Sequence, residues 1–378
     1  MTDSPDRRSR QRAWSYRRQR LGRAAEGPLG ALRDVVAVYS SHPTAPLALL
    51  ARAGLDSTRF GALEERREAL RIPAMRQSIF LVPRETAGRI FAATRLPIEK
   101  HAPRLRFAGL DWDQYAALKR RVLEVARAPM TTAALQAALG LDQRAVIGVK
   151  TMCREGLVLR IGSGLRSDSL RYVATEAWLG EPLEEADDEQ ALRWLAEAYL
   201  RGYGPARVAD FAWWSGVPKR RAQAALADLA VVDVGGGLLL PADQQPEFER
   251  VEPISADALD LLPKWDAYTM GHAPDGRERL LDDAHLRLAY TAPGGSATSG
   301  DGLALVLWGG RGVATWSHRF EGDRLRVSVA PFEPDTRLPG IERAFEEIAR
   351  LLGATALEVV VGEAASGARP ADGLEQDA

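Results

Sequence analysis

The sequence predicts an α+β fold in which tandem winged-helix units, built on the helix-turn-helix motif, precede a C-terminal β-rich domain. An order of three helices followed by a two-stranded hairpin occurs twice, within 111–180 and again within 185–245. After Pro241 the helical periodicity fades, and short apolar segments typical of strands replace it. A chain of 378 residues is long enough for several domains, each burying its own core.

The N-terminal segment 1–24 is a basic arm. Eight arginines lie between Arg7 and Arg23, interleaved with Trp14 and Tyr16. This composition predicts a helix, or a tail that becomes ordered on a polyanion. From Leu29 the apolar spacing becomes helical, and later elements are expected as a break at 40–44, a helix at 59–70 and an apolar strand at 78–82.

The segment 111–180 has the clearest pattern in the chain. The expected elements are an amphipathic helix at 113–127, a short helix capped by Thr131 or Thr132 and ending at Leu139, a third helix at 142–155, and strands at 157–161 and 170–174. Three helices followed by a hairpin are the order of a winged helix.

The segment 185–245 repeats this order. The expected elements are a helix at 188–203, a second from Pro205 to Trp214, a third from Pro218 to Leu229, and a hairpin at 231–240 around the glycines at 235–237. The aromatic residues Trp194, Tyr199, Trp213 and Trp214 lie on a helix-period apolar face, which is typical of core positions.

The C-terminal segment 250–362 is expected to be an α+β domain with mainly antiparallel pairing. The expected strands are 278–290, 303–308, 312–319, 324–330 and 356–361, with one helix at 339–352. The tail 363–378 is rich in Ala, Gly, Asp and Glu and is expected to be disordered.

Charge is distributed unevenly along the chain. The whole chain has a formal net charge of −1, but residues 1–174 hold 31 Lys and Arg against 16 Asp and Glu, a net of +15. A basic surface of this kind neutralises phosphates and releases their counterions, so it favours DNA as a partner. The alternative is that the two halves pack against each other, or that the arginines lie on solvated helix faces.

In a helix-turn-helix, the third helix enters the major groove, the groove wide enough to admit a helix. The candidate DNA contacts are Arg76, then Gln143, Arg144, Lys150 and Arg154 on the third helix of 111–180, Arg160, Arg166 and Arg171 on or near its wing, and Lys219 and Arg220 on the third helix of 185–245. The alternative is that either helix packs against a neighbouring domain.

The segment 261–272 resembles an ordered functional loop. It brings together Lys264, Trp265, Asp266 and His272, which supply a cation, an aromatic ring, a carboxylate and an imidazole. The alternative is a loop whose aromatic residues plug a domain junction.

Several function classes are excluded or left without a signature. The single cysteine, Cys153, allows no internal disulfide and no thiolate zinc cluster. No phosphate-binding Gly-rich loop or zinc-binding His-Glu-x-x-His motif occurs, so neither a metal nor a cofactor is expected. No apolar run approaches the roughly 18 to 20 residues that cross a bilayer, and the N-terminal arginines are not followed by the apolar stretch of a secretory signal, so we expect a cytoplasmic protein without a membrane partner.

Four segments together carry a resemblance to a known family. They are 75–83 (MRQSIFLVP), 202–216 (GYGPARVADFAWWSG), 261–268 (LLPKWDAY) and 307–316 (LWGGRGVATW). In this order they resemble the bacterial winged-helix DNA-binding-domain family that includes the AlkZ-type DNA glycosylases, over about 17–352. The resemblance implies three tandem winged helices in a C-shaped arrangement, with 25–110 as a degenerate first unit, and a basic concave surface for duplex DNA.

The resemblance also implies a catalytic site, and here the sequence departs from the family. Glycosylase members hydrolyse the N-glycosidic bond of alkylated or crosslinked bases with a Gln-x-Gln or Gln-x-Asp pair, which aligns with Tyr39 and Ser41. An amide or carboxylate can polarise the attacking water, whereas a serine hydroxyl is a far weaker base and a tyrosine is neutral near pH 7. The adjacent His42 could substitute as a base.

Three hypotheses follow. The leading one is a DNA-binding protein of DNA repair or genotoxin resistance, whose partner is duplex DNA that is damaged or lacks a strong sequence preference. The second is an active DNA glycosylase with a variant site at Tyr39, Ser41 and His42. The third is a winged-helix protein that binds another protein or a small ligand.

Overall fold

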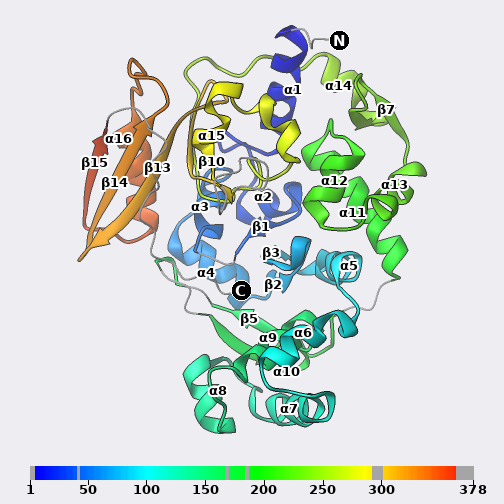
Figure 1. Ribbon diagram of the computed structural model, residues 1–378. Coiled ribbons are helices and arrows are strands. Elements are labelled where there is room, and N and C mark those ends of the chain that lie inside the picture. The colour runs from blue at the N-terminus through cyan, green and yellow to red at the C-terminus, as the bar shows by residue number, and fades with distance from the viewer. Residues whose placement is uncertain are drawn as a thin grey trace.

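The computed structural model describes residues 5–40, 43–162, 164–166, 170–183, 187–291 and 301–362 (Figure 1). The protein is a mixed α+β structure, as the sequence predicts. Ser41, His42 and the tail 363–378 lie outside the described residues. In the described part of the chain, no helix is long and apolar enough to cross a membrane.

The first segment lies at the centre of the molecule (Figure 1). Its elements are α2 (Pro28–Asp34), β1 (Val38–Tyr39), α3 (Ala45–Leu50), α4 (Ser57–Glu65), β2 (Ala69–Pro73), the turn η1 (Met75–Gln77), β3 (Ile79–Pro83) and α5 (Arg84–Thr94). The three strands form an antiparallel sheet in the order β1-β3-β2.

The helix expected at 59–70 is shorter than its apolar pattern suggests. It ends at Glu65, and Arg67 then adopts a positive φ of 59°, a conformation that breaks a helix. Every residue of β2 is buried, so both faces of this strand are covered by protein. A strand buried on both faces has no period-two alternation, and its apolar run therefore resembles a helix in the sequence.

The second segment forms the lower lobe in Figure 1. Its elements are η2 (Ile98–His101), α6 (Ala102–Phe107), α7 (Trp112–Val125), β4 (Met130–Thr131), α8 (Thr132–Leu139), α9 (Val146–Arg154), β5 (Val158–Ile161), β6 (Arg171–Ala174) and α10 (Thr175–Leu179). The Thr131 side chain caps α8 by accepting a hydrogen bond from the Ala134 amide at 3.1 Å. Strand β6 lies between β4 and β5 in an antiparallel sheet.

The third segment lies at the right of Figure 1 and shares a core with the first. Its elements are α11 (Asp188–Tyr203), α12 (Val208–Ser215), α13 (Lys219–Ala227), β7 (Val231–Asp233), β8 (Leu239–Pro241), η3 (Ala242–Gln244) and α14 (Gln245–Glu249). Leu81 of β3 and Leu195 of α11 belong to one buried cluster. These two segments therefore stabilise each other through common apolar burial.

The C-terminal segment forms a five-stranded sheet in the order β15-β14-β13-β12-β9. The strands are β9 (Leu259–Leu262), β12 (Leu305–Trp308), β13 (Arg311–Glu321), β14 (Arg324–Pro331) and β15 (Ala356–Val361), and α16 (Ile341–Leu351) joins β14 to β15. The pairing is antiparallel except between β14 and β15, which run parallel because a helix connects them.

The strand expected at 278–290 is wrong for all but its last residue. This region forms η4 (Pro274–Arg279), η5 (Asp283–His285) and α15 (Leu286–Ala289), followed by the short hairpin of β10 (Tyr290–Thr291) and β11 (Asp301–Gly302). Leu280 and Leu281 are 1% and 2% exposed, respectively. A strand with one solvated face would turn one of two consecutive leucines toward water.

The basic N-terminal segment is a helix, α1 (Pro5–Arg18), that packs against protein. Trp14 is 1% exposed and meets Phe248 edge to face, with ring centroids 5.8 Å apart. Arg18 Nε donates to the Arg201 carbonyl at 2.8 Å, and the Tyr16 hydroxyl donates to Asp260 at 2.6 Å. These contacts join the third segment to the C-terminal segment.

A buried ion pair joins α3 to the loop after β9. The Arg52 guanidinium donates to both carboxylate oxygens of Asp266, at 2.7 and 2.8 Å, and both side chains are 0% exposed. Arg52 also donates to the Ala48 carbonyl at 2.7 Å and to the Gln19 side chain at 3.2 Å. The charge of Arg52 is thus satisfied by three different parts of the chain.

We expect Arg52→Met to lower the free energy of unfolding by about 3–5 kcal/mol, because it leaves the Asp266 carboxylate buried without its counter-ion. The matched control is Arg59→Met, since Arg59 pairs with Asp56 at 3.8 Å with both side chains exposed, and its loss should cost about 0.5 kcal/mol or less. Urea denaturation followed by circular dichroism measures both. Equal losses in the two variants would contradict the importance of the buried pair.

Candidate functional site

The candidate site is a cavity of about 250 Å³ that forms where three parts of the chain meet. It lies among β1, the turn before β3, the end of α11, the loop after β9 and β11. Its lining residues are Ala37, Tyr39, Arg76, Ser78, Phe80, Tyr203, Trp265, Ala267, Met270 and Asp301. Tyr39, which the sequence analysis placed in the candidate catalytic pair, therefore opens onto a real cavity.

Aromatic rings make up much of the cavity wall. The Tyr39 ring lies 4.8 Å from the Trp265 ring at an interplanar angle of 53°, and 5.7 Å from the Phe80 ring at 89°. The Tyr203 hydroxyl donates to the Val35 carbonyl at 2.8 Å, and this hydrogen bond holds the Tyr203 ring in place. Rings held in this way offer faces and edges on which a planar ligand can stack.

The backbone around the cavity is strained. Val36, Arg76, Gln77 and Trp265 all have positive φ angles, between 52° and 67°. Non-glycine residues rarely adopt this conformation, and for a β-branched valine it is a clear outlier. Because such strain persists only where the surrounding structure enforces it, its concentration here marks the cavity as a functional candidate.

The loop after β9 contributes differently through each of its candidate residues. Trp265 lies in the cavity wall, and the Lys264 ammonium lies 4.2 Å from the centroid of its ring. Asp266 is committed to the ion pair with Arg52, and it also accepts a hydrogen bond from the Tyr268 amide at 2.8 Å. Asp266 thus fixes the loop, Trp265 lines the cavity, and Lys264 lies against the Trp265 ring.

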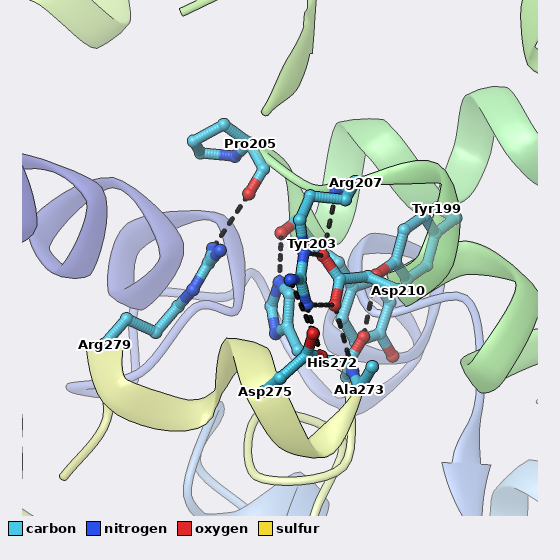
Figure 2. Close-up of polar contacts among 10 residues, drawn as sticks. Tyr199, Tyr203, Pro205, Arg207, Asp210, His272, Ala273, Asp275 and Arg279 are labelled. Carbon is cyan, nitrogen blue, oxygen red and sulfur yellow. Dashed lines mark hydrogen bonds and ion pairs between the residues drawn. The ribbon is translucent and has the colours of Figure 1, made fainter. Parts of the chain in front are cut away.

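His272 is buried away from the cavity, in the polar network of Figure 2. Its Nε2 donates to the Tyr203 carbonyl at 3.0 Å. Burial and the nearby Arg279 charge lower the pKa of His272 to about 3, so the ring is neutral. A neutral imidazole bound to the last residue of α11 holds that helix end in place.

Asp210 and Arg207 form the centre of the same network (Figure 2). Asp210 accepts from Arg207 Nη2 at 2.8 Å and from the Ala273 amide at 3.1 Å, and Arg207 also pairs with Asp275 at 2.7 Å. Although burial opposes ionisation, the hydrogen bonds from Arg207 lower the pKa of Asp210 to about 2. The network joins the start of α12 to η4.

Two arginines enclose Trp213 beside the cavity. The Arg76 guanidinium lies 4.1 Å from the Trp213 ring centroid, and that of Arg277 lies 5.1 Å from it and 3.9 Å from the Tyr290 centroid. The Arg76 side chain reaches solvent, but the protein atoms packed around it and the charge of Arg277 lower its pKa to about 10. Arg76 is therefore still cationic at neutral pH. The cavity mouth therefore carries positive charge next to aromatic rings.

The other candidate DNA contacts differ in exposure. Gln143, Arg144, Arg171, Lys219 and Arg220 are exposed, whereas Lys150, Arg154 and Arg160 are half-buried. Arg154 donates to the Gln77 side chain at 3.0 Å, and Arg160 lies 5.9 Å from the Tyr172 ring centroid. Arg166 is bound to the C-terminal segment: it donates to the Leu352 carbonyl at 2.7 Å and covers the Phe320 ring at 3.9 Å.

Sequence reasoning missed part of the lining. Ser78, Phe80, Tyr203 and Met270 lie in segments that the sequence analysis singled out, and Asp301 lies in none of them, but no pattern in the sequence indicates that these residues line one cavity. Asp301 in particular follows a Gly/Ser-rich run, in which a single aspartate gives no signal. The residue types of this lining can bind an organic group, and among the described residues no three His, Cys, Asp or Glu side chains are grouped to hold a metal ion.

A second hollow of about 330 Å³ lies between α1, the turn after β7 and η4. Three of its cations are engaged: Arg7 donates to the Gly235 carbonyl, Arg207 is held by Asp210 and Asp275, and Arg279 donates to the Pro205 carbonyl. The described residues that line this hollow include no aromatic ring. It therefore lacks the stacking surfaces that the Tyr39 cavity has.

The fold and the cavity define a mixed α+β protein in which helix-and-hairpin segments and a C-terminal sheet meet at an aromatic cavity. The sequence profile of the family described as "DNA glycosylase AlkZ-like" matches residues 32–355. The chain belongs to this family.

One solved structure supports the same fold. The chain is similar to that of the Streptomyces sahachiroi DNA glycosylase AlkZ, with a TM-score of 0.72, 21% sequence identity, and coverage of 96% of this chain and 100% of that one. No curated protein sequence matches the chain significantly.

The protonation of His272 predicts how stability depends on pH. Above about pH 6.5 the residue is neutral in both the folded and the unfolded state, whereas between there and pH 3 only the unfolded state takes up the proton. Stability should therefore fall as pH falls through this window, by up to about 1.4 kcal/mol per pH unit from this residue.

The variant His272→Asn, whose amide does not titrate, should show a weaker pH dependence in urea denaturation between pH 7 and pH 4.5. The control is His318→Asn, since His318 is exposed. If both variants keep the slope of the parent protein, His272 is not the residue that couples folding to pH.

Proposed function

We propose that this protein binds duplex DNA and accepts one extrahelical nucleobase in the Tyr39 cavity, as a DNA glycosylase of its family would. The observation that carries the proposal is the aromatic cavity at Tyr39, the position that the family resemblance assigns to catalysis. An enzyme that acts on a base must first take it out of the stack, and then reads it by stacking and edge contacts.

The size and chemistry of the cavity support a base-sized ligand. Pockets for drug-sized molecules span roughly 300–1,000 Å³, so about 250 Å³ suits a single ring system. Tyr39 and Trp265 supply stacking surfaces, and Arg76 at the mouth supplies a cation for the phosphate of the same nucleotide.

The surface that would receive the duplex is proposed as three tandem winged-helix units in a C-shaped arrangement. In this proposal α9 and α13 are the recognition helices. The helix expected at 142–155 begins only at Val146, so Gln143 and Arg144 lie in the turn before α9, whereas Lys219 and Arg220 lie in the first turn of α13. These four exposed side chains then face the groove, and Arg171 on β6 contacts the backbone. The name of the similar AlkZ structure is that of a DNA glycosylase, which supports DNA as the partner. The proposed location is the cytoplasm.

A second candidate function is DNA binding without base excision. It is favoured by the replacement of the family's Gln-x-Gln or Gln-x-Asp pair by Tyr39 and Ser41. Tyr39 packs against Trp265 and Phe80, so it serves here as part of the wall.

Binding to undamaged duplex DNA should weaken as salt rises. Each phosphate contact contributes a slope of about −0.9 to the plot of log K against log salt. The triple variant Arg171→Ala, Lys219→Ala and Arg220→Ala should therefore flatten this slope by about 2 to 3 in fluorescence anisotropy. The control is Arg319→Ala on β13, an exposed arginine of the C-terminal sheet. Salt-independent binding would favour a protein or ligand partner instead.

Filling the cavity should separate base recognition from duplex binding. Ser78 is half-buried and lines the cavity, so Ser78→Trp should abolish release of an N7-alkylated purine or of an interstrand crosslink from duplex oligonucleotides, while duplex affinity stays within about twofold. The control is Ser57→Trp, at an exposed position of α4. Full base release by Ser78→Trp would place the reaction elsewhere.

A further inference from the structure

We propose that Asp301 is the catalytic carboxylate of this site and replaces the pair that positions 39 and 41 lack. This inference rests on the proposed function, because it assumes that a nucleobase enters the Tyr39 cavity. Among the described residues that line the cavity, Asp301 is the carboxylate, and it enters from the C-terminal segment, whereas Tyr39 comes from β1.

The position of Asp301 is fixed through its neighbour, Gly302. Strands β10 and β11 pair Thr291 with Asp301 and Tyr290 with Gly302. The Gly302 carbonyl accepts a hydrogen bond from the Trp265 backbone amide at 2.9 Å, so the residue after Asp301 is tied to the backbone of the loop that carries Trp265. A Cβ at Gly302 would lie 3.0 Å from Met270 Sδ and 3.1 Å from Thr269 Oγ1, which explains why the chain needs glycine there.

The Asp301 carboxylate is available for chemistry. It is half-buried, and across the described ranges it has neither a hydrogen bond nor an ion pair. The other buried carboxylates near the junction are committed: Asp266 to Arg52, Asp210 to Arg207 and Asp260 to Tyr16. A carboxylate with unused acceptor oxygens can bind a water molecule and take its proton.

A cation lies within electrostatic reach of Asp301. The Asp301 carboxylate acts electrostatically on Arg76, which also lines the cavity. Arg76 lies against Trp213 and forms no ion pair with Asp301, so it leaves both carboxylate oxygens open.

The reaction balances with water as the one co-reactant. Asp301 takes a proton from water as the water oxygen forms a bond to C1′ of the deoxyribose. The bond between C1′ and the base nitrogen breaks, and its electron pair leaves with the base. An N7-alkylated purine carries a positive charge before cleavage, so it departs neutral and needs no proton from the protein. The products are an abasic site and the free base.

The decisive comparison is between Asp301→Asn and the parent protein, on a duplex that carries 7-methylguanine. Base release should slow by about 10²–10⁴-fold in Asp301→Asn, the range typical of a lost general base. Duplex affinity and the fluorescence rise of a 2-aminopurine placed at the target position should stay at parent values, because the amide keeps the shape of the side chain. The control is Asp283→Asn, an exposed aspartate of η5.

Chemical rescue distinguishes catalysis from a structural role. In Asp301→Ala, added sodium formate should restore part of the lost rate, because a small carboxylate can occupy the vacated space beside the cavity; sodium chloride at equal ionic strength should not. Normal base release by Asp301→Asn would overturn the inference. If Ser41→Ala or His42→Ala then loses base release, the catalytic group belongs to positions 41 and 42.

The failure of the proposed function itself has a different signature. If the parent protein neither releases the base nor raises the 2-aminopurine fluorescence, the cavity does not accept a nucleobase, and the proposed function fails together with this inference. If fluorescence rises but no base is released, the cavity accepts a base and the catalytic role of Asp301 is overturned.

Discussion

The buried ion pair between Arg52 and Asp266 is the interaction on which the site depends. It has no solvent exposure, so its desolvation cost is large and must be met by well-formed hydrogen bonds from both partners. Asp266 directly follows Trp265, and the pair therefore fixes an aromatic wall of the cavity to α3 of the first segment. Breaking it would leave a buried charge and also release the strained turn at Trp265.

The cavity forms where segments that are distant in the sequence pack against one another. The first and third segments contribute to one hydrophobic cluster, and the polar network of Asp210 and Arg207 joins the third segment to the C-terminal one. Helix α1 contacts the third segment through Arg18 and the C-terminal segment through Tyr16. A site placed at such a junction gains rigidity from all its neighbours, and this rigidity is what catalytic and binding geometry require.

The cavity brings together the position that the family resemblance assigns to catalysis and a carboxylate from another segment of the chain. Position 39 holds a tyrosine that packs against Trp265 and Phe80, and it contributes a stacking surface. A carboxylate entering the same cavity from β11 can supply the proton acceptor that β1 lacks. Fold similarity at 21% identity does not decide between these arrangements, because function depends on individual side chains in the site.

The sequence by itself determined several local elements: α7, α8 and α11 lie within two residues of their expected bounds, whereas α9 begins four residues later than expected. The agreement is close because capping residues such as Thr131 and Asp187 and the 3.6-residue period act over short distances. It also identified the family and Tyr39. It misread β2 and 278–290, where burial on several sides removes any periodic signal. Only the tertiary structure decided that Asp266 and His272 are buried supports and that Asp301 lines the same cavity as Tyr39, because each of these arrangements joins residues more than 60 positions apart.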